Sequence, residues 1–341
     1  MVRPTIVQPG ATAPDMGLAG PVAQVVASAL RDVEAIFERQ LASDMPPVNV
    51  LCRHVERYRG KMLRPSLVLL SGMAAVGRDD AGAVTQRHLM VGAVVEMIHM
   101  ATLVHDDVLD EAEVRRQGRT VNSLQGNETA VMLGDYLISN AFHLCSQAGE
   151  PWINLLLGKT TNTLCEGELI QLHNRDNLEL DEETYFEIVR RKTASLVAAC
   201  CLLGARLSGA SEELAESLGA FGTDVGTAFQ IQDDLLDLSG REDVVGKSLG
   251  RDLDKGKLTL PLIIHLSRAG RAERTDAEAA IAARDAGALL AMLRRSGALE
   301  DARRKALALV ERARARLDGL PAGAARDYLA AACGFVVSRD A

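Results

Sequence analysis

The stretch VGAVVEMIHMATLVHDDVLD, residues 91–110, decides the fold because an almost unbroken apolar run ends in a cluster of carboxylates. A run that is apolar on nearly every face is typical of a helix at the centre of a bundle. At about 100° per residue, Asp106, Asp107 and Asp110 fall within an arc of roughly 100°. Carboxylates on one side of a helix repel one another, so the pattern predicts a bound cation.

The same spacing recurs in QDDLLD, residues 232–237, where Asp233, Asp234 and Asp237 follow the apolar segment Val225–Ile231. One such cluster alone is also typical of a solvated helix end, but two of them favour a shared site. Carboxylates with room for water suit Mg²⁺, which keeps several waters and binds substrate phosphates. The sequence has neither the alternating pattern of a calcium loop nor a G-x-x-x-x-G-K-[ST] phosphate loop. The pair therefore predicts a diphosphate held between two helices.

Composition favours helices around this pair. The chain has 341 residues, 48% hydrophobic but only 3% aromatic, and Ala and Leu dominate, which favours an all-α fold over a sheet. The net charge of -8 argues against a partner that is a nucleic acid. Six cysteines without a Cys-x-x-Cys pair indicate reduced thiols and a cytoplasmic protein. Residues 1–20 lack the pattern of a targeting segment and predict a disordered tail. The longest apolar stretch, about 12 residues, predicts no transmembrane segment.

Apolar residues recur at helical spacing through residues 21–341, which predicts a single all-α domain, one large helical bundle. No linker rich in Pro, Gly or Ser divides it. Three or four further helices follow Asp276, in a tail rich in Ala, Arg and Glu that is expected to support the outer layer. The other predicted helices are Pro21–Ala42, Pro65–Ala75, Ala83–Glu111, Thr129–Cys145, Ile153–Leu172, Asp181–Leu207, Glu212–Leu236 and Pro261–Ala269.

The two motifs resemble the aspartate-rich motifs of the trans-isoprenyl diphosphate synthases, the polyprenyl synthetase family, and the match spans roughly Arg59 to Pro261. The resemblance implies an all-α homodimer in which the motifs face each other across a deep central cavity. It also implies three Mg²⁺ ions bound with the substrate diphosphate. Asp106, Asp110 and Asp233 would contact the metals directly. The carboxylates expected to support them or hold their waters are Asp107, Asp234 and Asp237.

Basic residues extend the resemblance to the substrates. RGKMLRP, residues 59–65, is similar to the family segment whose lysine and last arginine, here Lys61 and Arg64, grip the diphosphate of isopentenyl diphosphate. His99, seven residues before Asp106, would complete that site, although a lone His in an apolar helix is also typical of a core residue. Of Arg115 and Arg116, one would hold the allylic diphosphate and the other isopentenyl diphosphate. Without the motifs, this pair is also consistent with surface charge.

The resemblance assigns catalytic roles to Lys192, Thr193 and Gln230. Lys192 would bind the departing diphosphate, while Thr193 and Gln230 offer oxygen dipoles where positive charge develops on the allylic carbon. Lys247 and Lys257 would close over the bound diphosphate. The implied reaction breaks the allylic carbon–oxygen bond, lets the double bond of isopentenyl diphosphate attack the cation, and ends with loss of a proton.

Small residues before the first motif predict the product length. Thr102 and Ala101 lie about 6 and 7.5 Å back from Asp106 at 1.5 Å per residue. Large aromatics at these positions stop elongation early in the family, so the resemblance implies a product longer than geranylgeranyl diphosphate. Phe142 on a neighbouring helix is the candidate floor of the tunnel, although a lone Phe is also typical of a core. Such a product would need transient membrane contact for its release.

Four alternatives stay open at this point. A short-chain synthase making farnesyl or geranylgeranyl diphosphate would keep both motifs. A class I terpene cyclase shares the first motif but usually carries Asn, Ser and Glu in place of the second. A non-catalytic subunit of a heteromeric synthase typically loses aspartates or basic residues. A purely structural acidic bundle would not account for the basic residues at each family position.

Overall fold

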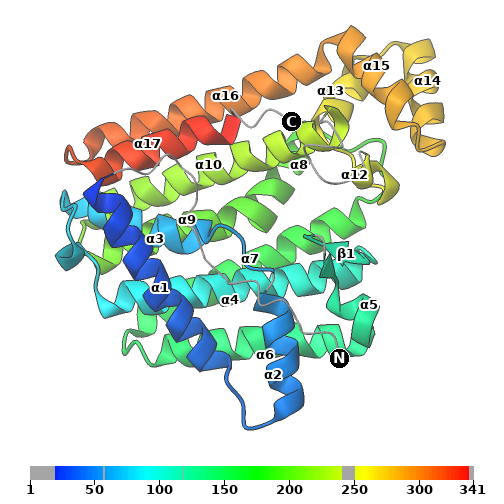
Figure 1. Ribbon diagram of the computed structural model, residues 1–341. Coiled ribbons are helices and arrows are strands. Elements are labelled where there is room, and N and C mark those ends of the chain that lie inside the picture. The colour runs from blue at the N-terminus through cyan, green and yellow to red at the C-terminus, as the bar shows by residue number, and fades with distance from the viewer. Residues whose placement is uncertain (1–19, 57, 117, 240–249, 338–341) are drawn as a thin grey trace.

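The computed structural model describes residues 20–56, 58–116, 118–239 and 250–337, and they form an all-α bundle with one short β-hairpin. The long helices lie roughly side by side (Figure 1). The hairpin pairs β1 (Val114–Arg115) with β2 (Gly118–Arg119) in antiparallel register. The α-helices are α1 (Pro21–Leu41), α2 (Pro46–Glu56), α3 (Leu63–Val76), α4 (Gln86–Leu109), α5 (Val121–Gln125), α6 (Asn127–Ser146), α7 (Pro151–His173), α8 (Glu182–Val189), α9 (Ser195–Leu207), α10 (Glu212–Ser239), α12 (Arg251–Asp254), α13 (Leu260–Arg268), α14 (Arg271–Ala282), α15 (Ala286–Ser296), α16 (Ala298–Arg316) and α17 (Ala324–Val337).

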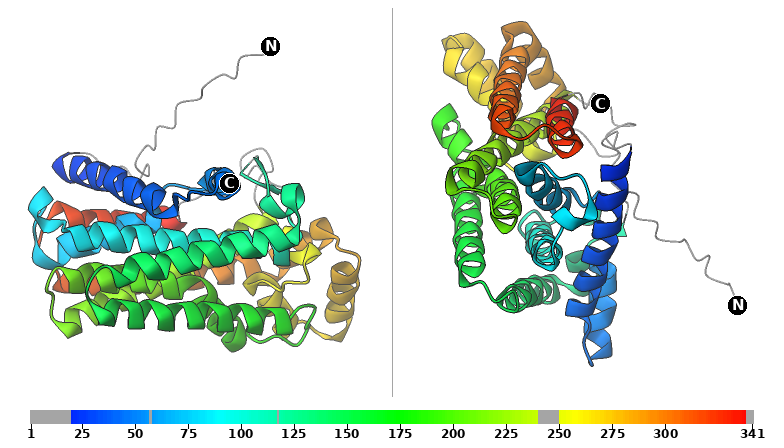
Figure 2. Two further views of the ribbon diagram at one scale, coloured as in Figure 1. Left: turned by 90° about the horizontal axis from the view of Figure 1, so that it is seen from below. Right: turned by 90° about the vertical axis from the view of Figure 1, so that its left-hand side faces the viewer.

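The bundle is built in layers that bury its most apolar helices. α4 packs against α1, α3 and α6, while α9 packs between α3 and α10, and α16 covers α10. The right-hand view of Figure 2 shows the same arrangement end-on, and α1 lies on the outside of the bundle in both views. Val94, Val95 and Met97 at the middle of α4 are fully buried, as its near-continuous apolar run predicts. The all-α bundle is therefore confirmed.

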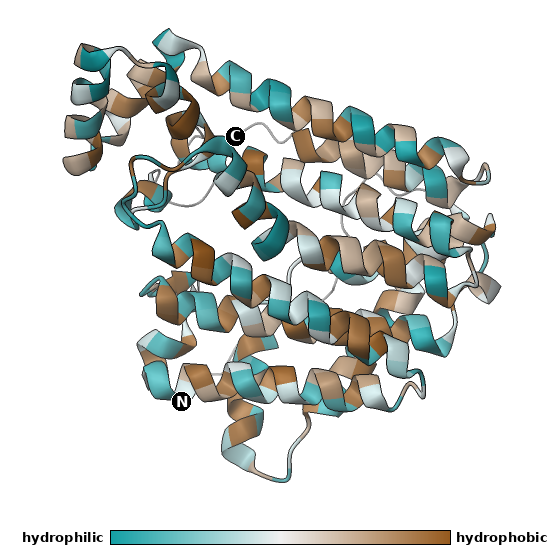
Figure 3. Cartoon of the chain, turned by 180° about the vertical axis from the view of Figure 1, so that it is seen from behind, coloured by the Kyte–Doolittle hydropathy of each residue, from teal (hydrophilic) through white to brown (hydrophobic). Residues whose placement is uncertain are grey.

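The helices after Gly270 form an outer layer. α16 alternates hydrophilic and hydrophobic stretches along its length (Figure 3). Its buried residues include Ala302, Ala306 and Val310, which are spaced by four and therefore share one face of the helix. Small side chains on that face let α16 pack closely onto the bundle, in agreement with the supporting role expected for this tail.

The structure divides the predicted helix Asp181–Leu207. A one-turn π-helix, η2 (Arg190–Ala194), lies between α8 and α9 and carries the predicted site residues Lys192 and Thr193. Hydrophobic periodicity does not reveal one extra residue in a turn, which is why the sequence indicated an uninterrupted helix. The sequence also did not predict α2, α5, α12 or the hairpin. Of these, α5, α12 and the hairpin are too short to carry a periodic pattern.

One helix is long and apolar enough to cross a membrane by length and composition alone. This helix is α4, and 67% of its most apolar window is buried inside the bundle. A core helix has the same length and composition, so α4 is weak evidence for a span. The predicted tail falls almost wholly on residues 1–19, outside the described residues. The single domain and the deep central cavity stay predictions.

Candidate functional site

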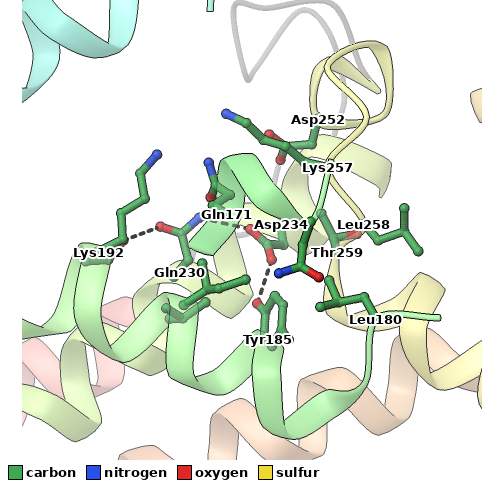
Figure 4. A pocket seen from close by; sticks show the side chains of 14 residues that line it. Gln171, Leu180, Tyr185, Lys192, Gln230, Asp234, Asp252, Lys257, Leu258 and Thr259 are labelled. Atoms are coloured by element: carbon green, nitrogen blue, oxygen red, sulfur yellow. Dashed lines mark hydrogen bonds between the residues drawn. The ribbon is translucent and has the colours of Figure 1, made fainter. Parts of the chain in front are cut away.

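A cleft lined by both polar and apolar side chains lies where several helices end. On the right of Figure 1, α12 and β1 lie near the end of α4. The cleft encloses about 110 Å³ and brings side chains from α7, α8, η2, α10 and α12 together with the segment after α12 (Figure 4). The lining residues are Gln171, Asn174, Leu180, Tyr185, Ile188, Val189, Lys192, Thr193, Gln230, Asp234, Asp252, Lys257, Leu258 and Thr259. Of the residues predicted from the sequence, Lys192, Thr193, Gln230, Asp234 and Lys257 therefore share one cleft.

The π-helix η2 presents Lys192 and Thr193 to this cleft. π-Bulges inside helices are frequent at functional sites because they re-aim the side chains that follow. Gly167 of α7 allows the close approach on one side, since a Cβ there would lie 2.5 Å from the backbone nitrogen of Lys192. The local backbone therefore fixes where the Lys192 ammonium enters the cleft.

A chain of hydrogen bonds connects η2 with the second aspartate motif. The Thr193 hydroxyl donates to Gln230 Oε1 at 3.0 Å, and Gln230 Nε2 donates to Asp234 Oδ1 at 2.9 Å. The Tyr185 hydroxyl donates to the other oxygen of Asp234 at 2.6 Å (Figure 4). Burial, with the nearby charge of Asp252, raises the pKa of Asp234 well above its usual range. Asp234 therefore orients Gln230 and Thr193 from a buried position.

Asp237, the last carboxylate of the second motif, faces α12. Its two oxygens accept the backbone N–H groups of Arg251 at 3.3 Å and Asp252 at 3.2 Å. Burial, together with the charge of Asp252, raises the pKa of Asp237 to about 6. Asp233 is half-buried on the same helix. In this arrangement Asp237 anchors the segment that carries Lys257 into the cleft.

In the first motif, Asp106 faces the lysine of η2. Lys192 Nζ lies 3.9 Å from Asp106 Oδ1 and also forms an ion pair with Glu168 of α7. Burial opposes the charge on Lys192, but Asp106 and Glu168 outweigh it and raise the pKa of the ammonium. For Asp106, burial raises the pKa of the carboxyl, and the positive charge of Lys192 opposes this shift. Lys192 thus links the first motif to the cleft.

Asp107 points elsewhere, so the structure does not bring all three carboxylates of this motif together. It is 1% exposed, and its Oδ1 accepts Arg115 Nε at 2.8 Å. Burial raises the pKa of Asp107, and Arg115 opposes this shift. Arg115 is thereby held beside α4 by the hairpin, which places it at the same end of the bundle as Asp106.

Asp110 lies at the C-terminal end of α4 and pairs with three cations. Lys255 Nζ lies 2.7 Å from Asp110 Oδ2, Lys257 Nζ lies 3.1 Å from Oδ1, and an Arg175 guanidinium nitrogen lies 3.6 Å from Oδ1. Burial works against the charge of Asp110, but Lys257 and Lys255 outweigh it and lower the pKa of the carboxyl. Lys257 lines the cleft beside Asp234, so it connects both motifs.

A group of arginines surrounds His99, which lies about two turns before Asp106 on α4. Burial lowers the pKa of His99 well below its usual range, and the nearby charges of Arg64, Arg116 and Arg115 lower it further. Arg64 Nε is buried and has no hydrogen-bond partner among the described residues. Glu96, one turn before His99, is 3% exposed and faces Arg64 and Arg116, with Arg59 and Glu34 also nearby. The partnerless Arg64 Nε, beside the other guanidinium groups near His99, suits an anionic ligand.

The remaining predicted residues lie as follows. Lys61 is exposed, and its ammonium lies 5.5 Å from the centre of the Phe335 ring on α17. Ala101 is fully buried, whereas the Thr102 hydroxyl is partly exposed and donates to the carbonyl of His99 at 2.7 Å. Phe142 is partly buried against the core. Lys247 lies outside the described residues.

The carboxylates fit Mg²⁺ only together with a phosphate ligand. In the part of the chain that the structure describes, no three His, Cys, Asp or Glu side chains lie close enough to hold a metal ion by themselves. Mg²⁺ keeps several waters and is usually bound through one or two carboxylates plus substrate phosphates. Asp106 and Asp110, one turn apart on α4, provide such a pair. The donor set therefore matches a metal that arrives with a diphosphate.

Several site residues carried no clear signal in the sequence. Tyr185 reaches the site from α8, Glu168 from the last turns of α7 and Arg175 from the segment that follows α7, all far from either motif in the sequence. Glu96 was hidden inside the apolar run of α4. Lys255 alone had a local signal, because it stands two residues before Lys257 in KGK.

Comparison with known proteins identifies the family of the chain. Residues 46–291 match the family model described as Polyprenyl synthetase. The chain is 36% identical to heptaprenyl diphosphate synthase component 2 of Geobacillus stearothermophilus over 91% of this chain and 96% of that one. It is 33% identical to octaprenyl diphosphate synthase of Escherichia coli (strain K12), over 93% of this chain and 98% of that one.

Solved structures resemble the whole bundle. A decaprenyl diphosphate synthase from Rhodobacter capsulatus superimposes with a TM-score of 0.86 and 34% identity, covering 94% of this chain and 98% of that one. The family match, the relatives and the fold agree along nearly the same length. The chain therefore belongs to the polyprenyl synthetase family.

Proposed function

We propose that this protein is a prenyltransferase that adds isopentenyl diphosphate to allylic diphosphates and makes linear all-trans polyprenyl diphosphates longer than geranylgeranyl. The observation that carries the proposal is the linkage of both aspartate motifs to one cleft, Asp106 through Lys192 and Asp110 through Lys257. The three relatives described above are named for hepta-, octa- and decaprenyl products, which supports a long chain.

The cleft holds the allylic diphosphate. Asp106, Asp110 and Asp233 are the proposed Mg²⁺ ligands, and the other aspartates of the two motifs support them. Bound Mg²⁺, three ions in our proposal, supplies positive charge for the departing diphosphate. Lys192 holds the same leaving group. Thr193 and Gln230, fixed through Asp234, place oxygen dipoles beside the developing allylic cation.

The cluster around His99 holds the second substrate. Arg64 and Arg116 lie close to His99, and a guanidinium binds phosphate oxygens in a bidentate manner. Lys61 would swing from the Phe335 ring to the same diphosphate. Burial of this site keeps water away from the cation, which water would otherwise quench. The reaction ends with loss of a proton, and the released pyrophosphate is its proposed acceptor.

The chain grows along α4, past Thr102 and Ala101 and toward Phe142. Ala101 is fully buried and has no side chain beyond Cβ, so a larger residue at this position would obstruct the proposed path of the product. We further propose a cytoplasmic homodimer that touches a membrane only to release its product. The name of one relative, a synthase "component 2", favours a second arrangement in which this chain needs a different partner chain for activity.

The test is product analysis with the purified protein, Mg²⁺, farnesyl diphosphate and labelled isopentenyl diphosphate. A ladder of products longer than geranylgeranyl diphosphate is expected, and it should vanish for Asp106→Asn. Asp327→Asn on the exposed surface of α17 is the matched control and should keep the ladder. Ala101→Tyr should shorten the products.

A stop at geranylgeranyl diphosphate with the wild-type protein would contradict the long-chain proposal. The absence of any product from the protein alone, with activity restored by a second chain, would instead establish the heteromeric arrangement. The absence of product in both cases would refute a catalytic role.

A further inference from the structure

The turn Lys255–Gly256–Lys257 directs two ammonium groups at a single carboxylate. Both lysines contact Asp110, at 2.7 Å and 3.1 Å. Gly256 has φ +69°, a left-handed conformation that residues with a Cβ rarely adopt. This conformation lets the side chains on either side of the glycine reach the same acceptor.

The turn is fixed in place by the segment that follows α7. The Asp176 backbone N–H donates to the carbonyl of Gly256 at 2.8 Å, and a Cβ on Gly256 would meet the Asp176 carboxyl at 2.6 Å. The same segment supplies the third cation, since Arg175 lies 3.6 Å from Asp110 and donates to the carbonyl of Leu109 at 3.3 Å. The backbone therefore fixes the position of the turn from which both lysines reach Asp110.

Asp110 is the shared partner of three cations at this point. One carboxylate, 16% exposed, has three cations within salt-bridge distance, and these cations are themselves only 14–32% exposed. Cations held together in a partly desolvated site attract a further anion. The cleft beside Lys257 is where the proposed function places the allylic diphosphate.

We propose that Lys255 and Arg175 are additional diphosphate-positioning residues, which Asp110 holds ready in the substrate-free protein. When Asp110 engages the metal, Lys255 exchanges the carboxylate for an oxygen of the allylic diphosphate, and Arg175 follows at longer range. The inference rests on the proposed function for the identity of the ligand. It adds two cations to those that the sequence predicted for this diphosphate, which are Lys192, Lys247, Lys257 and one of Arg115 and Arg116.

The exchange gives two binding effects of opposite sign. Lys255→Ala removes a cation from the diphosphate and should weaken binding of inorganic pyrophosphate in Mg²⁺ buffer by about 5- to 10-fold, as expected for a partly exposed charge-assisted hydrogen bond. The same substitution removes a competitor for Asp110. It should therefore tighten binding of Mn²⁺, measured without pyrophosphate, by about 2- to 5-fold.

The experiment uses the full-length protein, with calorimetry for pyrophosphate and electron paramagnetic resonance for Mn²⁺. Lys255→Arg should restore pyrophosphate affinity, because the charge and reach are kept. Lys305→Ala is the control, since Lys305 forms an ion pair of the same length, 2.7 Å, with Glu182 away from the lining of the cleft. It should change neither affinity.

Two outcomes would overturn the inference: no loss of pyrophosphate affinity in Lys255→Ala, or a change of both affinities in the same direction. Turnover is a separate readout. A wild-type protein that makes no product would refute the proposed function, whereas an active wild type without the opposite shifts would refute only the role of Lys255.

Discussion

Replacing Tyr185 by Phe tests whether buried polar contacts behind the cleft support its chemistry. The substitution keeps the ring, which packs edge-on against Phe186 at 5.5 Å, and removes the hydroxyl that donates to Asp234 at 2.6 Å. A buried acceptor that loses a donor costs about 1–3 kcal/mol, which corresponds to about 5- to 150-fold in an equilibrium constant. Residues that orient metal-site carboxylates typically change metal affinity or activity by about 10- to 100-fold.

We therefore expect Tyr185→Phe to raise the Mg²⁺ concentration for half-maximal turnover by about tenfold or more. Urea unfolding should show a loss of about 1–3 kcal/mol in the free energy of unfolding. Tyr136→Phe is the matched control, because the Tyr136 hydroxyl makes only a long contact of 3.4 Å with the carbonyl of Leu41. If both variants keep the wild-type Mg²⁺ requirement, the reasoning about Asp234 is refuted.

Three further predictions concern stability. Asp224 is 3% exposed and paired with two arginines of α16 that are 58% and 34% exposed, so Asp224→Ala should lower the free energy of unfolding in urea by about 1–3 kcal/mol; an unchanged stability would contradict this. Gly204→Ala places a Cβ 2.1 Å from the carbonyl oxygen of Val68 and should lower the free energy of unfolding in urea by about 1–3 kcal/mol or more. Gly158→Ala is the matched control, because its Cβ meets nothing within 4 Å, and it should raise the free energy of unfolding by about 0.5–1 kcal/mol in the same assay. The pKa of Asp237 is raised to about 6 from its usual 3.8, so between these pH values the folded protein holds a proton that the unfolded chain has lost. The contribution of Asp237 to the free energy of unfolding should therefore fall as the pH rises from about 4 to about 6. If Asp237→Asn does not change the slope of the free energy of unfolding against pH in this range, this prediction is refuted.

Agreement between sequence and structure is best where a pattern is long. α4, α6 and α7 lie within a few residues of their predicted bounds, because each carries an apolar periodicity over many turns. The π-helix η2 was not predicted, since a single inserted residue barely alters that periodicity. The missed elements α5 and α12 have five and four residues, too few for a pattern.

The sequence by itself determined the all-α fold, the family and the identity of the two aspartate motifs. These properties depend on local spacing and on residue type, which the chain carries without being folded. Burial could also be read from the apolar run of α4, because a helix that is apolar on nearly every face is stable only when other helices cover it.

Only the tertiary structure decided which partner each charged group takes. Asp107 turns to Arg115 while Asp110 faces Lys255 and Lys257, although the two aspartates stand three residues apart on one helix. Tyr185 reaches Asp234 across 49 positions in the sequence. Such pairings are set by the packing of α7, α8 and α10 at one end of the bundle, because charge and hydrogen-bond energies depend on distance in space and not on separation along the chain.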